Sequence, residues 1–340
     1  MVGLWGRSTT HHEAPALEEW ARMLRGAVLI LGLGLGLIVG RIVWFDAYWI
    51  FRESPPWLQA TGGASRLLDR QTRRAKVLQG MSRRYRVALV GSSTVYHGLD
   101  PNDAGKNYRG QIFNAGISAL LADELPLVAA IVAARADVER VVIGLDYYMF
   151  SRSDVPVRLS PSLQGRLGRW NTWLGSLLSE YALRDSSLWE VAGSEDPGSW
   201  TYQGFRITPK QPPDLTRLND AVRRRTTTAY RPETLGGLKT ALIRLAGRRV
   251  EIYIAPISEA QRRVLSDKGL LADFARWKAD VGRVAAAAGV SAVDFTDLGA
   301  AFPFSPEEGS TEGWLDNLHF TPLIGRMIFE RLGLGEAEVF

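Results

Sequence analysis

Short apolar segments alternate with helical segments along most of this chain, and this alternation constrains its fold more than any other feature. The strand candidates are residues 86–90, 111–114, 140–145, 250–255 and 291–294. Helices are expected at 120–136, 271–288 and 323–332, where apolar residues recur over helical lengths. Short buried strands joined by helices predict a parallel sheet that is covered on both faces. We therefore predict a three-layer α/β/α fold with about five parallel strands in a flavodoxin-like order.

The turn after the first strand candidate presents a hydroxyl group. Val87 to Val90 lead into the tight turn Gly91-Ser92-Ser93. Far downstream, Asp316 and His319 supply a carboxylate and an imidazole three residues apart, a spacing that puts both on one side of a helical turn. A hydroxyl nucleophile, a base and an orienting acid are the minimum set for acyl transfer through a covalent intermediate.

Other polar or small residues follow the strand candidates directly. Sheets of this class place their sites at the carboxyl ends of the strands, near the switch in strand order. Ser93, Gly116 and Asp146 each come just after a strand candidate, so we expect them to meet at this edge. Ser92 lies in the same turn, and His97 is four residues after Ser93. His97 is a candidate substrate-binding residue or alternative base, and a local hydrogen-bonding role is the other interpretation.

These motifs resemble the SGNH, or GDSL-like, hydrolase superfamily over residues 85–335, apart from an insertion at 151–240. The family's Gly-Asp-Ser block is matched by Gly91-Ser92-Ser93, with serine in place of aspartate. Its glycine block is matched by Asn114-Ala115-Gly116, and its final Asp-x-x-His block by Asp316 and His319. The resemblance implies that Ser93 is the nucleophile, and that the backbone N–H groups of Ser93 and Gly116 form the oxyanion hole.

The third family block departs from the pattern. The family commonly has Gly-x-Asn-Asp, whereas this chain has Gly144-Leu145-Asp146-Tyr147. An ionised Asp146 would repel a developing oxyanion, so we expect it to be held by another donor or to have a different task, such as substrate binding.

The overall pattern is similar to membrane-anchored relatives, the alginate O-acetylation proteins and the D-alanyl transfer protein of teichoic acid pathways. This resemblance implies a serine acyltransferase or esterase that acts on acyl groups, most simply acetyl groups, of a cell-surface or exported polysaccharide. No metal, cofactor or nucleic acid is implied. The alternative is a catalytically degenerate domain that binds glycan or scaffolds an export complex, and the altered third block favours it.

An unbroken apolar run extends from Gly26 to Gly40 and continues past Arg41. It is long enough for one crossing of a membrane, and aromatic residues follow it as they do at membrane interfaces. We predict a tail at 1–25, an uncleaved anchor at 26–50 and a basic stalk at 51–84. A cleavable signal peptide and a buried soluble helix are the alternatives.

The charges around this run predict its orientation. Three arginines precede it and a single one, Arg52, stands just after it; the three are Arg7, Arg22 and Arg25. The bias predicts a cytoplasmic N-terminus, and hence a single-pass protein of the inner (cytoplasmic) membrane with an extracytoplasmic C-terminal domain. Within the run, one glycine face would let the helix of a membrane-embedded acyl-donor protein approach, although glycine is also simply common in membrane helices; the face consists of Gly32, Gly36 and Gly40.

Composition and the remaining segments add weaker expectations. The chain has no cysteine, which excludes a disulfide, a thiol nucleophile and a thiolate metal site. Its net charge of +5 is mild and does not indicate nucleic acid. The adjacent His11 and His12 lie in the predicted tail, and we do not expect them to form a metal site. The insertion at 151–240 is expected to be a cap over the strand ends, partly helical at 163–183. Its tryptophans are either sugar-stacking or packing residues; they are Trp170, Trp173, Trp189 and Trp200.

Overall fold

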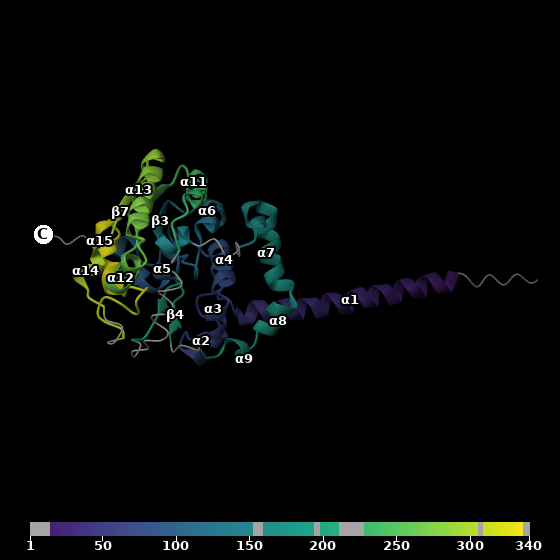
Figure 1. Ribbon diagram of the computed structural model, residues 1–340. Helices are drawn as coiled ribbons and strands as arrows, with labels where there is room; N and C mark the ends of the chain where they lie inside the picture. The colour runs from purple at the N-terminus through teal and green to yellow at the C-terminus, as the bar shows by residue number, and fades with distance from the viewer. Residues whose placement is uncertain (1–13, 152–158, 194–197, 211–227, 305–308, 336–340) are drawn as a thin grey trace, which may run out of the picture.

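A computed structural model of the chain describes residues 14–151, 159–193, 198–210, 228–304 and 309–335. They form an α/β domain with a long N-terminal helix, α1 (Ala14–Phe45), that projects away from it (Figure 1). The domain contains a five-stranded parallel sheet in the order β2-β1-β3-β6-β7, which confirms the predicted fold class. Its strands are β1 (Val87–Val90), β2 (Ile112–Asn114), β3 (Arg140–Leu145), β6 (Arg249–Ile254) and β7 (Ser291–Asp294).

The strand order changes direction at β1. This strand pairs with β2 on one side and with β3 on the other, and Val87 lies opposite both Ile112 and Arg140. The carboxyl ends of the three strands are therefore neighbours, and the crevice of such a sheet lies at this point. The segments that begin at Gly91, Ala115 and Asp146 leave the sheet there, as the sequence predicted.

Helices cover both faces of the sheet because successive strand side chains alternate. Ala88 and Val90 belong to one core cluster, and Val87 and Leu89 to the other. The first face is covered by α6 (Leu125–Ala133), α11 (Leu235–Arg244) and α13 (Leu271–Ala287), and the second by α5 (Ser93–Gly98) and α15 (Pro322–Arg331). In α13 the core-facing residues recur every three or four positions, the period of an amphipathic helix; they are Phe274, Trp277, Val281 and Val284.

Residues 51–84 pack on the domain and do not form a separate stalk leading to it. Within the predicted stalk, α3 (Arg66–Arg70) and α4 (Thr72–Ser82) meet at Gln71, and a short α2 (Pro56–Thr61) precedes them. Leu78 of α4 is fully buried. Arg73 pairs with Glu124 at 2.6 Å, and Arg83 donates to the carbonyls of Trp49 and Tyr202. These arginines therefore hold the domain together instead of facing lipid or solvent.

The helix α1 contains one stretch, Glu18–Phe45, that is long and apolar enough to cross a membrane, and little of it is buried inside the protein. Gly32, Gly36 and Gly40 lie on its open surface, where an added Cβ would meet nothing within 4 Å. The structure is thus consistent with a single-pass anchor. The side of the membrane on which the domain lies, and the acyl-donor partner, remain predictions. Arg7, His11 and His12 lie outside the described residues.

The described part of the insertion predicted at 151–240 divides into three parts. Residues 228–240 do not belong to a cap, because they pack in the core and run into α11, which covers the sheet. The helices α7 (Arg166–Leu178), α8 (Glu180–Asp185) and α9 (Leu188–Val191) follow a short 3-10 turn, and α7 and α8 contact α1. The hairpin β4 (Ser199–Trp200) and β5 (Arg206–Ile207) contacts α5 instead. The hairpin thus contacts the helix that begins with Ser93.

Candidate active site

The turn after β1 presents the predicted nucleophile at the start of a helix. Gly91 permits the close approach of β3, because a Cβ there would lie 2.6 Å from the Gly144 carbonyl oxygen. Ser92 then caps α5, its Oγ accepting the N–H of Thr94 at 3.2 Å. Ser93 is therefore the first residue of α5, and only 3% of it is exposed.

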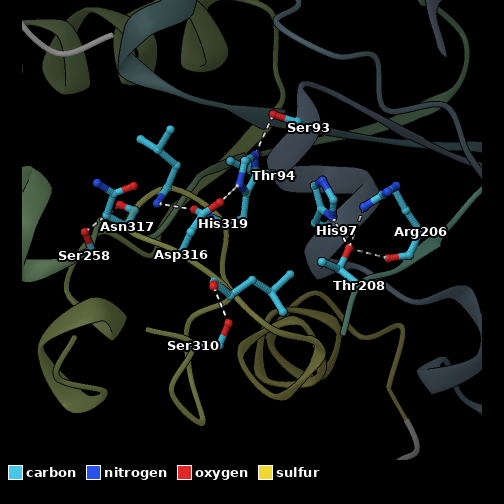
Figure 2. A network of polar contacts seen from close by, with 12 residues as sticks. Ser93, Thr94, His97, Arg206, Thr208, Ser258, Ser310, Asp316, Asn317 and His319 are labelled. Carbon is cyan, nitrogen blue, oxygen red and sulfur yellow. Dashed lines mark hydrogen bonds and ion pairs between the residues drawn. The ribbon is translucent and has the colours of Figure 1, made fainter. Parts of the chain in front are cut away.

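The structure brings Ser93, His319 and Asp316 into one hydrogen-bonded chain (Figure 2). Ser93 Oγ lies 2.9 Å from His319 Nε2, and His319 Nδ1 lies 2.7 Å from Asp316 Oδ2. This is the order that activates a hydroxyl: the carboxylate fixes the ring with a proton on Nδ1, which leaves Nε2 to accept the hydroxyl proton.

The loop that carries Asp316 and His319 is not the helical turn that the spacing suggested. The Leu315 N–H donates to the His319 carbonyl at 2.8 Å, and Trp314 bridges to Phe320. Inside this turn, Asp316 Oδ1 accepts the N–H groups of Leu318 at 2.7 Å and His319 at 2.8 Å. The aspartate therefore does two things at once: one oxygen shapes the loop, and the other orients the imidazole.

These contacts also decide the ionisation of Asp316. Burial by itself would raise the pKa of this carboxyl. The neighbouring His319, together with the backbone N–H groups of Leu318 and His319, outweighs burial and brings the pKa of Asp316 well below its usual range. The carboxylate is thus ionised at neutral pH, as an imidazole-orienting acid must be.

Asp146 is held by hydroxyl donors from the nucleophile turn. Its Oδ2 accepts hydrogen bonds from Ser92 Oγ and from Thr94 Oγ1, the latter at 3.0 Å. The two hydroxyls flank Ser93, so Asp146 ties the end of β3 to the turn that carries the nucleophile. This arrangement agrees with the expectation that another donor holds Asp146, and it places the carboxylate behind the turn as a positioning group.

Gly116 lies against the same turn, but its N–H is already engaged. A Cβ on Gly116 would meet the Ser92 carbonyl oxygen at 2.9 Å, which shows how closely the two loops pack. The Gly116 N–H donates to Asn114 Oδ1 at 3.1 Å. Asn114 is held in turn through its Nδ2, which donates to the carbonyls of Val95 and Leu99. The Gly116 N–H, the predicted oxyanion donor, is thus occupied by an acceptor in its own loop.

His97 lies beside His319, on the next turn of α5 after Ser93. Its ring centre is 4.6 Å from that of His319, and its Nδ1 lies 2.8 Å from Thr208 Oγ1 (Figure 2). Burial, reinforced by the nearby His319 and Arg206, lowers the pKa of His97 well below its usual range. His97 is therefore a neutral neighbour of His319, held by a hydrogen bond to the hairpin.

Sequence reasoning missed the residues of the insertion that hold His97. Arg206 Nη1 lies 3.2 Å from Thr208 Oγ1, and Arg206 Nε donates to Asp69 of α3 at 2.9 Å. A buried lysine, Lys76 of α4, donates to the carbonyls of Asn114 and Gly204 and so clamps the hairpin to the end of β2. Burial lowers the pKa of Lys76 well below its usual range. No sequence motif marks these residues.

The described residues hold no group of three or more histidine, aspartate and glutamate side chains placed to bind a metal ion. Hydrogen bonds join the predicted site residues in two sets, Ser93 with His319 and Asp316, and Ser92 with Asp146. His97 lies against the first set, and Gly116 lies against the nucleophile turn. The chemistry that these residues support is proton transfer from a hydroxyl, with the nucleophile at a helix start.

A scan against protein-family models gives no match to this chain, and neither does a search of curated proteins. Among solved structures, the chain is similar to one titled "The structure of a putative platelet activating factor from Streptococcus pneumonia". The likeness covers 78% of this chain and 92% of that one, at 11% sequence identity and a TM-score of 0.40. At these values the likeness is distant, so the chemistry of the site rests on its own geometry.

Proposed function

We propose that this protein is a membrane-anchored SGNH-type serine acyltransferase or esterase. Its substrates would be acyl groups, most simply acetyl groups, of a cell-surface or exported polysaccharide. The observation that carries the proposal is the chain of hydrogen bonds from Ser93 through His319 to Asp316. Ser93 begins α5 and His319 lies 226 positions later in a loop, and the residues meet near the switch point of the sheet.

The geometry supports a two-step reaction. Ser93 Oγ attacks the acyl carbonyl while its proton passes to His319 Nε2, and the ionised Asp316 stabilises the imidazolium. The imidazolium then returns this proton to the leaving alcohol, which leaves the acyl group on Ser93. Attack by water releases a free acid, whereas attack by a sugar hydroxyl completes a transfer; His319 accepts the attacking proton in either case.

The N–H of Ser93 is the first donor that we propose for the oxyanion. The first N–H groups of a helix have no acceptor within it, and Ser93 begins α5. The Gly116 N–H would become the second donor if the substrate oxygen displaced Asn114 Oδ1, since Gly116 already lies against the nucleophile turn. In this proposal Asp146 does not face the oxyanion, because Ser92 and Thr94 hold it.

The anchor supports an exported substrate. An apolar helix of spanning length precedes the domain, and the arginines before it favour a cytoplasmic N-terminus. We therefore propose that the domain acts outside the cytoplasm, at the surface of the inner membrane. A partner that supplies the acyl group would reach the anchor through its open glycine face.

The alternative is a degenerate domain that binds glycan or scaffolds an export complex. The engaged Gly116 N–H is the observation that favours it, because without a second donor the oxyanion would be poorly stabilised. Such a domain would keep the fold and the hydrogen bonds but would not form an acyl-enzyme.

Labelling of the full-length protein with a fluorophosphonate, followed by peptide mapping, tests the proposal. We expect one labelled residue, Ser93, with labelling abolished in Ser93→Ala and unchanged in Ser162→Ala, an exposed serine of the insertion. A folded protein that is not labelled would support the degenerate alternative. Labelling at Ser92 in the same turn, or at Ser118 two residues after Gly116, would refute the assignment of the nucleophile. Release of acetate from an acetylated polysaccharide would then separate hydrolysis from transfer.

A further inference from the structure

The exposed face of α7 is apolar, whereas a surface helix of a soluble protein presents a polar face to solvent. Four large side chains recur every three or four positions along it and form one stripe, which we call the α7 stripe. Their exposed fractions are 80% for Leu167, 52% for Trp170, 42% for Leu174 and 56% for Leu178. A contiguous exposed apolar surface of this kind marks an interaction site.

The contacts of α7 and α8 with α1 fix where the stripe lies. Leu177 of α7 and Ala182 of α8 pack in one small cluster with Ile42, near the end of α1. Arg41 of α1 also donates to the Ser186 carbonyl at 3.1 Å. The helical part of the insertion is therefore attached to α1 at the level where its apolar run ends.

Figure 1 shows the same arrangement in space. The helix α7 lies on the side of the domain from which α1 leaves, and it runs across the direction of α1. A membrane crossed by α1 would thus have α7 lying along its surface. The next helices, α8 and α9, lie on this side too and add exposed aromatic and apolar side chains; these are Tyr181, Leu188 and Trp189.

The chemistry of this surface suits the boundary between head groups and acyl chains. Tryptophan and tyrosine concentrate at that depth because their rings are apolar with one polar edge. The charged side chains of α7 to α9 balance, since three basic residues stand against three acidic ones: Arg166, Arg169 and Arg184 against Glu180, Asp185 and Glu190. Apolar area, and not attraction to anionic lipid, would therefore hold this surface in place.

We infer that α7 to α9 form an interfacial platform that lies in the membrane surface and fixes the orientation of the domain on it. The inference rests on the proposed membrane anchor and adds a second, in-plane attachment beside α1. The bilayer is the occupant because the platform continues directly from the spanning helix and lies across it. A single helix leaves its domain free to tilt and rotate, whereas two attachments hold the site at a fixed height and direction.

Spin labels can test this in the full-length protein, because the natural chain has no cysteine. Single variants Leu174→Cys, Leu271→Cys and Leu33→Cys would carry a nitroxide in nanodiscs of phosphatidylcholine that hold one protein each. Leu271 of α13 is a matched control, being 44% exposed against 42% for Leu174, and α13 lies on the other side of the domain (Figure 1). Leu33 reports on the span itself. For each label we measure two collision rates, one with oxygen, which partitions into lipid, and one with a water-soluble nickel chelate. The ratio of the two rates reports whether the label lies in lipid or in water.

We expect labels at Leu33 and Leu174 to favour oxygen, and the label at Leu271 to favour the nickel chelate, with oxygen-to-nickel ratios several-fold apart. If Leu33 favours oxygen while Leu174 resembles Leu271, the platform is refuted and the anchor stands. A water-exposed Leu33 would refute the anchor, and the platform with it. A Leu174 label shielded from both reagents would show that protein and not lipid covers the stripe, which also refutes the inference. Catalysis at Ser93 is tested separately by phosphonate labelling, so the two proposals can fail independently.

Discussion

Replacing Gly98 with alanine should push His319, the proposed base, away from Ser93, the proposed nucleophile. Gly98 ends α5, five residues after Ser93, and a Cβ there would lie 2.0 Å from Phe320 Cε2. Carbon atoms in contact lie about 3.5–4.0 Å apart, so helix and ring must separate by about 1.5 Å. Phe320 is fully buried and adjacent to His319, which leaves the ring little room to turn away.

The size of the effect follows from this displacement. Ser93 Oγ and His319 Nε2 are now 2.9 Å apart, and a shift of this size would break their hydrogen bond. A misplacement of about 1 Å costs on the order of 100-fold in rate, which is the loss we expect in the rate of phosphonate labelling. Overpacking should also lower the free energy of unfolding by about 1–3 kcal/mol.

The assay is the labelling rate of purified full-length protein, with thermal unfolding measured in parallel. Gly282→Ala is the matched control, because a Cβ at this position in α13 meets nothing within 4 Å. It should keep the labelling rate and gain up to about 1 kcal/mol of stability. The double variant Gly98→Ala with Phe320→Leu should recover part of the lost rate. A folded Gly98→Ala variant that is labelled at the wild-type rate would refute the reasoning.

Three further predictions concern the base, its neighbour and the topology. His319→Ala should lose labelling at least as strongly as Asp316→Asn, and both far more than His97→Ala; a silent His319→Ala would move the site to His97. The fold lowers the pKa of His97, so below pH 6.5 the His97 side chain is protonated more readily in the unfolded chain than in the folded one. The free energy of unfolding should therefore fall as the pH decreases below 6.5. The fall should be less steep in His97→Gln than in wild type. Urea unfolding across that pH range measures this difference, and equal slopes would contradict it. Reporter fusions at the C-terminus should be active outside the cytoplasm and silent inside it, and the opposite pattern would reverse the topology.

Local sequence was enough to predict the five strands of the central sheet, but not the hairpin of β4 and β5. Residues 140–145 and 291–294 are strands with the predicted bounds. For residues 140–145 the reason is a short run of branched apolar residues, which is typical of a buried strand. Residues 291–294 form a mostly exposed edge strand. The helix at 271–288 was predicted to within one residue, since its apolar positions repeat at the helical period over a long segment. The order of these elements predicted the three-layer fold and the edge at which the site lies.

Local sequence was not enough for residues 51–84. Basic composition suggested a solvated stalk, yet Arg83 is buried and donates to the carbonyls of Trp49 and Tyr202. Every residue has a backbone carbonyl, so the sequence does not indicate which carbonyls accept hydrogen bonds from a buried arginine. Whether an arginine faces water or a buried carbonyl is decided by which distant segment packs over it.

The site shows the same division. The sequence by itself determined which residue types were available, a serine in a strand-end turn and an Asp-x-x-His pair, and the order in which they occur. Tertiary structure alone decided that Asp316 shapes a non-helical loop, that Ser92 and Thr94 hold Asp146, and that Thr208, 111 residues from His97, is its hydrogen-bond partner. The physical reason is that periodicity and turn chemistry act between residues a few positions apart, whereas hydrogen bonds at a site join groups whose distance depends on how the whole core packs.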